Sequence, residues 1–225
     1  MVYYADNFYI DIARADFKFI VLKSNCLFIS EPTKIAKVDL GFAIGVASRD
    51  ASNTLQHMKD IIKSIVDKYG TDKVHYGLIT FDNKASIKIP FSSRIDSAAS
   101  LKSLIDSVPV TTGGPAVDKA LEAAITLFGG EGVRYDAQKV LVLMVDKKSS
   151  GDDAAATKTA MELKDSGVNI ITVAVGAEAY PNNLKNISST PDNVVNTSTT
   201  DKPDEVGNQI IDRTGAVVDN VIERF

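Results

Sequence analysis

The feature that most constrains this chain is a nearly continuous apolar stretch, residues 38–44, that runs straight into a loop of small residues. Its composition predicts a strand that is buried on both faces, as strands at the centre of a parallel sheet are. In open α/β sheets, ligands bind in the crevice beyond the carboxyl ends of such strands. The loop that begins at Gly45 is therefore the first place to look for a functional site.

Strands and helices are predicted to alternate along the rest of the chain. This pattern indicates an α/β fold that is doubly wound, with a mostly parallel central sheet and helices on both faces. The segment 85–89 is expected at an edge of the sheet, and its direction is left open. The expected strands are 38–44, 73–81, 85–89, 139–145, 169–175 and 193–197, and the expected helices are 53–69, 97–107, 116–128, 152–166, 181–188 and a last one from residue 203.

The chain has two histidines. His57 is predicted on the polar side of helix 53–69, opposite a clear apolar stripe, and His75 is predicted to point outward or sideways from its strand. Neither has an acidic residue or a cysteine at a spacing typical of metal ligands. Structural or surface roles are expected for both.

Composition excludes several classes of function. The 225 residues carry a net charge of −4, from 29 acidic and 25 basic side chains, and no dense basic run suggests nucleic-acid binding. No apolar run reaches the roughly 18 residues that span a bilayer. The single cysteine, Cys26, cannot form a disulfide framework or a zinc site within the chain. No glycine-rich nucleotide loop, serine elbow or pair of catalytic carboxylates is found, so we expect no enzyme.

Five blocks occur in an order that resembles the von Willebrand factor type A domain over residues 37–214. They are Val38–Arg49, Tyr69–Phe81, Gly113–Leu121, Lys139–Asp146 and Gly167–Gly176. The second and third blocks are most similar to the copies found in matrilins, collagen type VI and invertebrate matrix proteins. The resemblance implies the same doubly wound fold.

Members of that family hold a divalent cation at a metal-ion-dependent adhesion site, using an Asp-x-Ser-x-Ser loop, a threonine and an aspartate. The matching positions here are Gly45, Ala47, Arg49, Pro115 and Asp146. Only Asp146 keeps its oxygen ligand, and one carboxylate does not hold Mg²⁺ in water. The resemblance therefore implies a degenerate site without a metal cofactor.

Two questions about this loop remain open in the sequence. Asp50 and Ser52, with Thr54, repeat an Asp-x-Ser-x-Thr pattern downstream, either as caps of the helix expected near Asn53 or as a displaced metal site. Arg49 either takes the place of the ion and pairs with Asp146, or points to solvent.

The resemblance implies a non-catalytic protein-binding or adhesion domain of an extracellular matrix protein. Binding would be metal-independent, with collagen or another matrix protein as partner, or the domain would serve in matrix assembly. The expected binding surface is the rim of the crevice, formed by Val46, Ser48, Arg49, Asp146, Lys147 and Lys148. The alternative is an intracellular scaffold of the same fold, since the chain lacks the terminal disulfide that secreted members often carry.

Two acceptor sequences for N-glycosylation, at Asn186 and Asn196, apply if the chain is secreted. Residues 1–36 match nothing in the family and begin without a basic segment, so we expect no signal peptide there. The apolar run 17–29 is either an extra strand or hairpin, or a leader on a fragment of a longer protein. Residues 215–225 continue an apolar helical stripe, which either lies on its own domain or self-associates with another helix.

Overall fold

The computed structural model describes residues 2–5, 8–11, 37–47, 51–93, 95, 97–110, 113–179 and 181–215. The chain divides into two compact units, Met1–Ile35 and Ala36–Phe225. In the first unit, β1 (Val2–Ala5) and β2 (Phe8–Asp11) pair antiparallel, with Tyr4 and Tyr9 at matching positions in the strand register. The predicted segment 17–29, with Cys26, lies outside the described residues.

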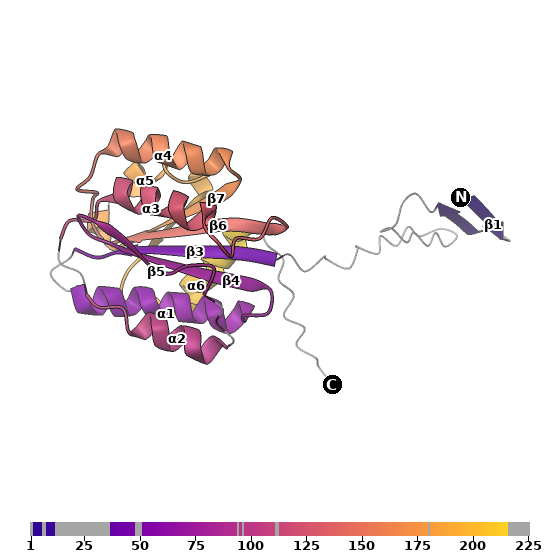
Figure 1. Ribbon diagram of the computed structural model, residues 1–225, viewed down its shortest axis with the longest axis horizontal. Coiled ribbons are helices and arrows are strands. Elements are labelled where there is room, and N and C mark those ends of the chain that lie inside the picture. The colour runs from indigo at the N-terminus through magenta and orange to yellow at the C-terminus, as the bar shows by residue number, and fades with distance from the viewer. Residues whose placement is uncertain are drawn as a thin grey trace. The chain divides into compact units, whose positions relative to one another are not determined.

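The second unit contains a six-stranded sheet with the order β5-β4-β3-β6-β7-β8. All neighbours run parallel except β5, which is antiparallel to β4. The buried central strand that the sequence predicted is β3, which lies between β4 and β6 (Figure 1). The strands are β3 (Lys37–Gly45), β4 (Val74–Phe81), β5 (Ala85–Ile89), β6 (Ala137–Val145), β7 (Val168–Val175) and β8 (Val194–Thr197).

Helices cover both faces of this sheet and enclose two hydrophobic cores. Apolar residues of α1, α2 and α6 pack in the core on one face, and those of α3, α4 and α5 pack in the core on the other (Figure 1). The doubly wound α/β fold is thereby confirmed. The helices are α1 (Ala51–Tyr69), α2 (Ala98–Asp106), α3 (Val117–Gly129), α4 (Asp153–Asp165), α5 (Pro181–Leu184) and α6 (Pro203–Thr214), with 3-10 turns at Ala177–Ala179 and Pro191–Asn193.

Two helices differ from the sequence prediction. α5 ends at Leu184 instead of residue 188, and a turn follows it in which the backbone N–H groups of Ile187 and Ser188 both donate to the Leu184 carbonyl, at 3.1 and 2.9 Å. α1 begins at Ala51, which places Ser52 inside the first turn. Asp50, the other predicted cap, lies outside the described residues.

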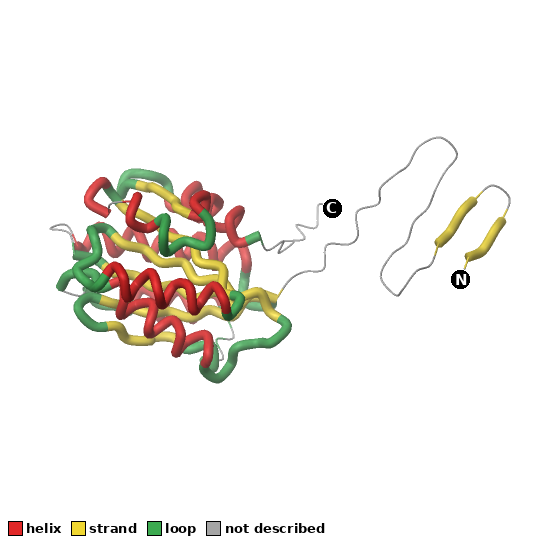
Figure 2. Tube along the Cα trace, turned by 90° about the horizontal axis from the view of Figure 1, so that it is seen from above, coloured by secondary structure: helices red, strands yellow, loops and turns green. Residues whose placement is uncertain are grey.

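The end of α6 is fastened to the amino-terminal end of the sheet. Gly215 follows the helix with a positive φ of 67°, a conformation that favours glycine. The amide of Gln138 donates to the carbonyl of Thr214, whose hydroxyl lies 3.0 Å from the Tyr69 hydroxyl. As a result, the start of β3 and the end of α6 lie at the same end of this unit (Figure 2). The predicted helical extension after Gly215 lies outside the described residues.

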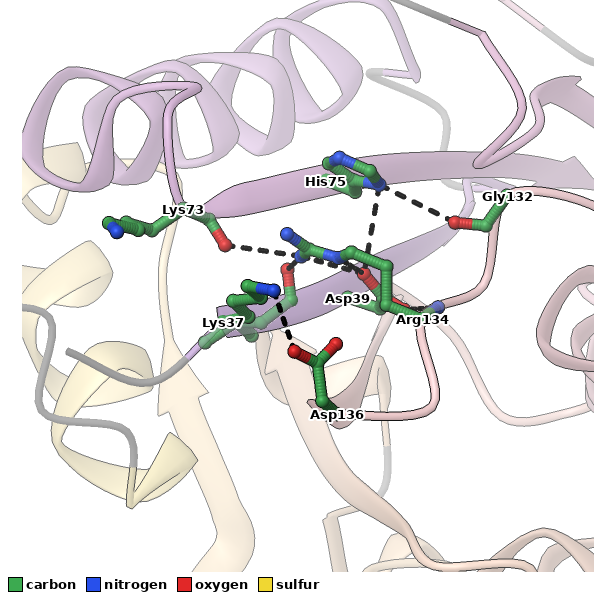
Figure 3. A network of polar contacts seen from close by, with 8 residues as sticks. Lys37, Asp39, Lys73, His75, Gly132, Arg134 and Asp136 are labelled. Atoms are coloured by element: carbon green, nitrogen blue, oxygen red, sulfur yellow. Dashed lines mark hydrogen bonds and ion pairs between the residues drawn. The ribbon is translucent and has the colours of Figure 1, made fainter. Parts of the chain in front are cut away.

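A buried ion pair fixes the start of β3. Asp39 has no exposed surface, and its Oδ1 accepts hydrogen bonds from the Arg134 guanidinium, with Nε at 2.8 Å, while its Oδ2 accepts from the Arg134 backbone N–H at 2.7 Å (Figure 3). Nη2 of Arg134 also donates to the carbonyls of Val38 and Lys73, at 2.6 and 3.1 Å. One side chain thus joins β3 to the loops that precede β4 and β6.

We predict that Arg134→Ala lowers the free energy of unfolding by about 3–5 kcal/mol, because it leaves the Asp39 carboxylate buried without its cation. Asp136→Ala is the matched control. It removes only the exposed pair between Lys37 and Asp136, where the side chains are 46% and 39% exposed, and exposed pairs contribute little. Urea unfolding followed by circular dichroism measures both variants, and equal effects would contradict the assigned role of Asp39.

The position of His57 was predicted wrongly. It is 7% exposed, and its Nε2 has no hydrogen-bond partner among the described residues. α6 packs along α1, where the Ser64 hydroxyl donates to the Pro203 carbonyl at 3.1 Å, and Asp201 in the loop before α6 lies near enough to His57 to act on its charge. Burial lowers the pKa of His57, while the carboxylates of Asp201 and Asp60 act in the opposite direction.

A neutral buried His57 predicts a pH-dependent stability. The unfolded chain binds a proton at His57 near its ordinary pKa of about 6.5, whereas the folded chain does so only at lower pH. The contribution of neutral His57 to the free energy of unfolding should therefore be fully present above pH ~6.5. It should be lost as pH decreases toward the lowered pKa of the folded state. His57→Gln should flatten this part of the stability curve, measured by urea unfolding at a series of pH values. An unchanged curve in His57→Gln would contradict the prediction.

Candidate functional site

The candidate site lies at the carboxyl ends of β3 and β6, where the family resemblance places the degenerate metal site. Gly45 is the last residue of β3, and the ring of Phe81 fills the space beside it. A Cβ atom built on Gly45 would lie 2.5 Å from the Phe81 ring. Phe81 is itself only 1% exposed, so it cannot easily move aside. An aspartate side chain therefore has no room at this position.

Asp146 is the one acidic residue at the predicted metal-site positions, and its carboxylate forms a hydrogen bond within the protein. It directly follows β6, is 3% exposed, and its Oδ1 accepts a hydrogen bond of 2.8 Å from the backbone N–H of Ala47. This bond fastens the loop after β3 to the end of β6. The predicted pairing with Arg49 stays a prediction, because Ser48 and Arg49 lie outside the described residues.

The second loop of the site packs closely against the loop after β6. The Pro115 side chain is buried and has no atom that could bind a metal ion. Its backbone carbonyl accepts a hydrogen bond from the Ser150 N–H at 3.2 Å. A Cβ atom on Gly114 would lie 2.5 Å from the Ser150 side chain. Within the described residues, no group of three or more His, Cys, Asp or Glu side chains could hold a metal ion. These positions therefore do not fit the divalent cation that the family binds.

Asp118 is a buried acid that sequence reasoning missed. It is 6% exposed, and its Oδ1 has no hydrogen-bond partner among the described residues. It lies against Gly151, at the start of α3, where the helix dipole favours a carboxylate. The signal was present in the sequence, because this residue stands where the resembling family block has a glycine.

The predicted binding rim is smaller than expected. Val46 was predicted at its surface, but it is 3% exposed and packs in the core with α1, so this assignment is corrected. Lys147 is partly exposed, with Nζ 3.6 Å from the Glu178 carboxylate. Lys148 is exposed. Among the described rim residues, the two lysines therefore supply the accessible charge.

Lys148 also borders a cavity of about 200 Å³ beside the crevice. The cavity lies among the loop after β6, the start of α4 and the segment that includes α5. Its polar lining offers both donors and acceptors, and Val117 and Leu184 contribute apolar surface. The polar side chains include Lys148, Asp153, Asn182, Asn183 and Asn186. A polar group of a partner could be bound there through several hydrogen bonds.

Comparison with known proteins identifies the fold family. A family model for the von Willebrand factor type A domain matches residues 39–209. The chain belongs to this family. Mouse integrin alpha-X is 24% identical over 187 residues, which are 80% of this chain and 16% of that protein. The human collagen alpha-5(VI) chain is 24% identical over 178 residues, which are 77% of this chain and 7% of that protein.

Among solved structures, proximal thread matrix protein 1 from the mussel byssus has a TM-score of 0.68 and 27% identity, covering 80% of this chain and 46% of that one. That structure has zinc at its metal-ion-dependent adhesion site. The present type A domain matches its fold but lacks most of the family's ligands. It also spans only a small part of the curated relatives, so their activities as whole proteins do not transfer directly.

The structure places both predicted acceptor sequences for glycosylation among its described residues. Asn186 and Asn196 both lie on the surface of the domain. Glycosylation of either residue stays a prediction. Ser188, in the first acceptor sequence, is buried and hydrogen-bonded to Thr172 at 2.8 Å. Among the described residues, no helix has the length and apolar character needed to cross a membrane.

We predict that Gly45→Asp, which restores a family ligand, lowers the free energy of unfolding by about 1–3 kcal/mol because the new side chain collides with Phe81. It should bind no Mg²⁺ in isothermal titration calorimetry. Ala47→Ser restores a second ligand at a half-buried position without this collision, and its effect should stay within about 0.5 kcal/mol. A stable Gly45→Asp variant that binds Mg²⁺ would contradict the crowding argument.

Proposed function

We propose that this type A domain is a non-catalytic, metal-independent protein-binding module of an extracellular matrix protein, with collagen or another matrix protein as its partner. The observation that carries the proposal is the Phe81 ring against Gly45, in the space that a metal-binding aspartate would need. Membership of the family, and relatives that include collagen chains and a byssus matrix protein, support the matrix setting.

Binding without a metal would use the crevice rim as a surface of hydrogen bonds and charge. Lys148 is exposed at this rim, next to a cavity with three asparagine side chains. Amides both donate and accept hydrogen bonds, so they suit the polar backbone and side chains of a partner protein. Asp146 contributes indirectly, because its bond to the Ala47 N–H shapes the loop.

An intracellular scaffold of the same fold is the second candidate. It is favoured by the single cysteine, which leaves the chain without the terminal disulfide that secreted members often carry. A secretory signal in the full-length gene product would favour the extracellular matrix protein over the intracellular scaffold.

The test is solid-phase binding of the domain to a panel of fibrillar and network-forming collagens, with and without EDTA. We expect binding that EDTA does not change, and a loss of about two- to fivefold in affinity for Lys148→Ala, since a rim charge contributes modestly. Lys88→Ala, which removes an exposed lysine from the edge strand β5, should bind as the wild type does. EDTA-sensitive binding would contradict metal independence, and absence of binding to every collagen would contradict this choice of partner.

A further inference from the structure

We propose that the end of the domain opposite the crevice is a self-association surface, on which Tyr135 of one molecule enters a cavity beside His75 of a second copy, and the reverse. This inference concerns a different surface from the proposed partner-binding rim. It starts from an unusual residue. Tyr135 is 100% exposed, whereas the other large apolar side chains that are exposed among the described residues reach at most 57%.

The backbone on both sides of Tyr135 is anchored, although the tyrosine side chain is fully exposed. Its neighbour Arg134 forms the buried ion pair with Asp39, and its other neighbour, Asp136, pairs with Lys37 at 2.6 Å (Figure 3). The Ala137 N–H bonds to the Arg134 carbonyl at 3.4 Å and closes a turn around Tyr135. Tyrosine has only two side-chain torsions, so ordering it on an anchored backbone costs little conformational entropy, and tyrosines are enriched among the residues that dominate interfaces.

A cavity of about 290 Å³ opens at the same end of the sheet. Its apolar walls include Val74, Phe91 and Ile95. The lining residues that carry polar groups are Thr71, His75, Tyr76 and Ser93. Sites for drug-sized ligands begin at about 300 Å³, so this cavity suits a single large side chain. The mixture of apolar walls and hydroxyl or imidazole groups matches a phenol, which needs an apolar site for its ring and a hydrogen-bond partner for its hydroxyl.

His75 connects the cavity with the loop that carries Tyr135. Its Nδ1 lies 3.4 Å from the Gly132 carbonyl and 3.9 Å from Asp39, and its other ring nitrogen points away from this network (Figure 3). In the tautomer with its proton on Nδ1, His75 donates to the Gly132 carbonyl, and its Nε2 is then an acceptor for a phenol hydroxyl. Gly132 in turn packs against the backbone of Phe91 and Ser92, next to the cavity. The tyrosine and the cavity therefore belong to one continuous surface.

The charges at this end favour binding to a second copy of the chain over binding to a partner whose surface charges have a single sign. A two-fold symmetric interface brings a surface against itself, so a surface with one dominant sign would repel its copy. Here both signs are interspersed at exposed positions, with Lys37 and Lys73 as the cations and Asp72, Glu131 and Asp136 as the anions, at the start of β3 and in the loops before β4 and β6. Because tyrosine and cavity share this surface, a two-fold pairing makes the same contact twice.

The test is sedimentation velocity of the full chain from micromolar to millimolar concentration. We expect a monomer–dimer equilibrium that Tyr135→Ser weakens by about tenfold or more, since it removes the anchor from both copies. Ser93→Trp, which fills the mouth of the cavity from an exposed position, should weaken it similarly. Met161→Ser, on α4, removes an exposed apolar side chain elsewhere and should leave the equilibrium unchanged.

Mixing the two variants gives the decisive measurement. A Tyr135→Ser copy keeps its cavity and a Ser93→Trp copy keeps its tyrosine, so the mixed dimer regains one of the two contacts. Its affinity should exceed that of either variant alone and stay below that of the wild type. A wild type that stays monomeric at millimolar concentration, a dimer insensitive to Tyr135→Ser, or a mixture no tighter than its components would each overturn the proposal. Circular dichroism confirms that each variant is folded.

Discussion

The ion pair between Asp39 and Arg134 is the interaction on which the arrangement of this domain most depends. A carboxylate with no exposed surface stands at the start of the central strand, and burial of an unpaired charge there would be costly. Arg134 satisfies it from a different loop, and also binds the carbonyls of Val38 and Lys73. The start of β3 and the loops before β4 and β6 are thereby set relative to one another. The same pair holds Tyr135 in its exposed position.

The packing at the opposite end of β3 supports the proposed loss of the family's metal site. Loss of ligands is visible in the sequence, but Phe81 adds a steric reason, because its ring fills the space beside Gly45. Asp146 is kept, and it has a structural contact with the backbone of Ala47. An aspartate restored at Gly45 would therefore meet a packed core instead of an empty site. Binding at this end would depend on the rim residues and the neighbouring cavity.

The two ends of the sheet thus differ in character. The carboxyl end has the exposed Lys148 and a cavity rich in amides, which suits a polar partner surface. The amino end has an exposed aromatic side chain, a cavity with apolar walls and balanced charges. A matrix protein that binds a partner at one end and its own copy at the other would have a simple means of building larger assemblies.

The sequence by itself determined the fold class and the order of the elements, and it carries the prediction of a degenerate metal site. These follow from local patterns: apolar stretches such as 38–44, helical spacing in 53–69, and residues such as Gly45 and Pro115 whose side chains lack donor atoms. The tertiary structure alone decided which distant residues meet. Three contacts join segments that are far apart in the chain: the Phe81 ring beside Gly45, the ion pair between Arg134 and Asp39, and the packing that buries His57. Periodicity within one segment carries no information about which other segment packs against it.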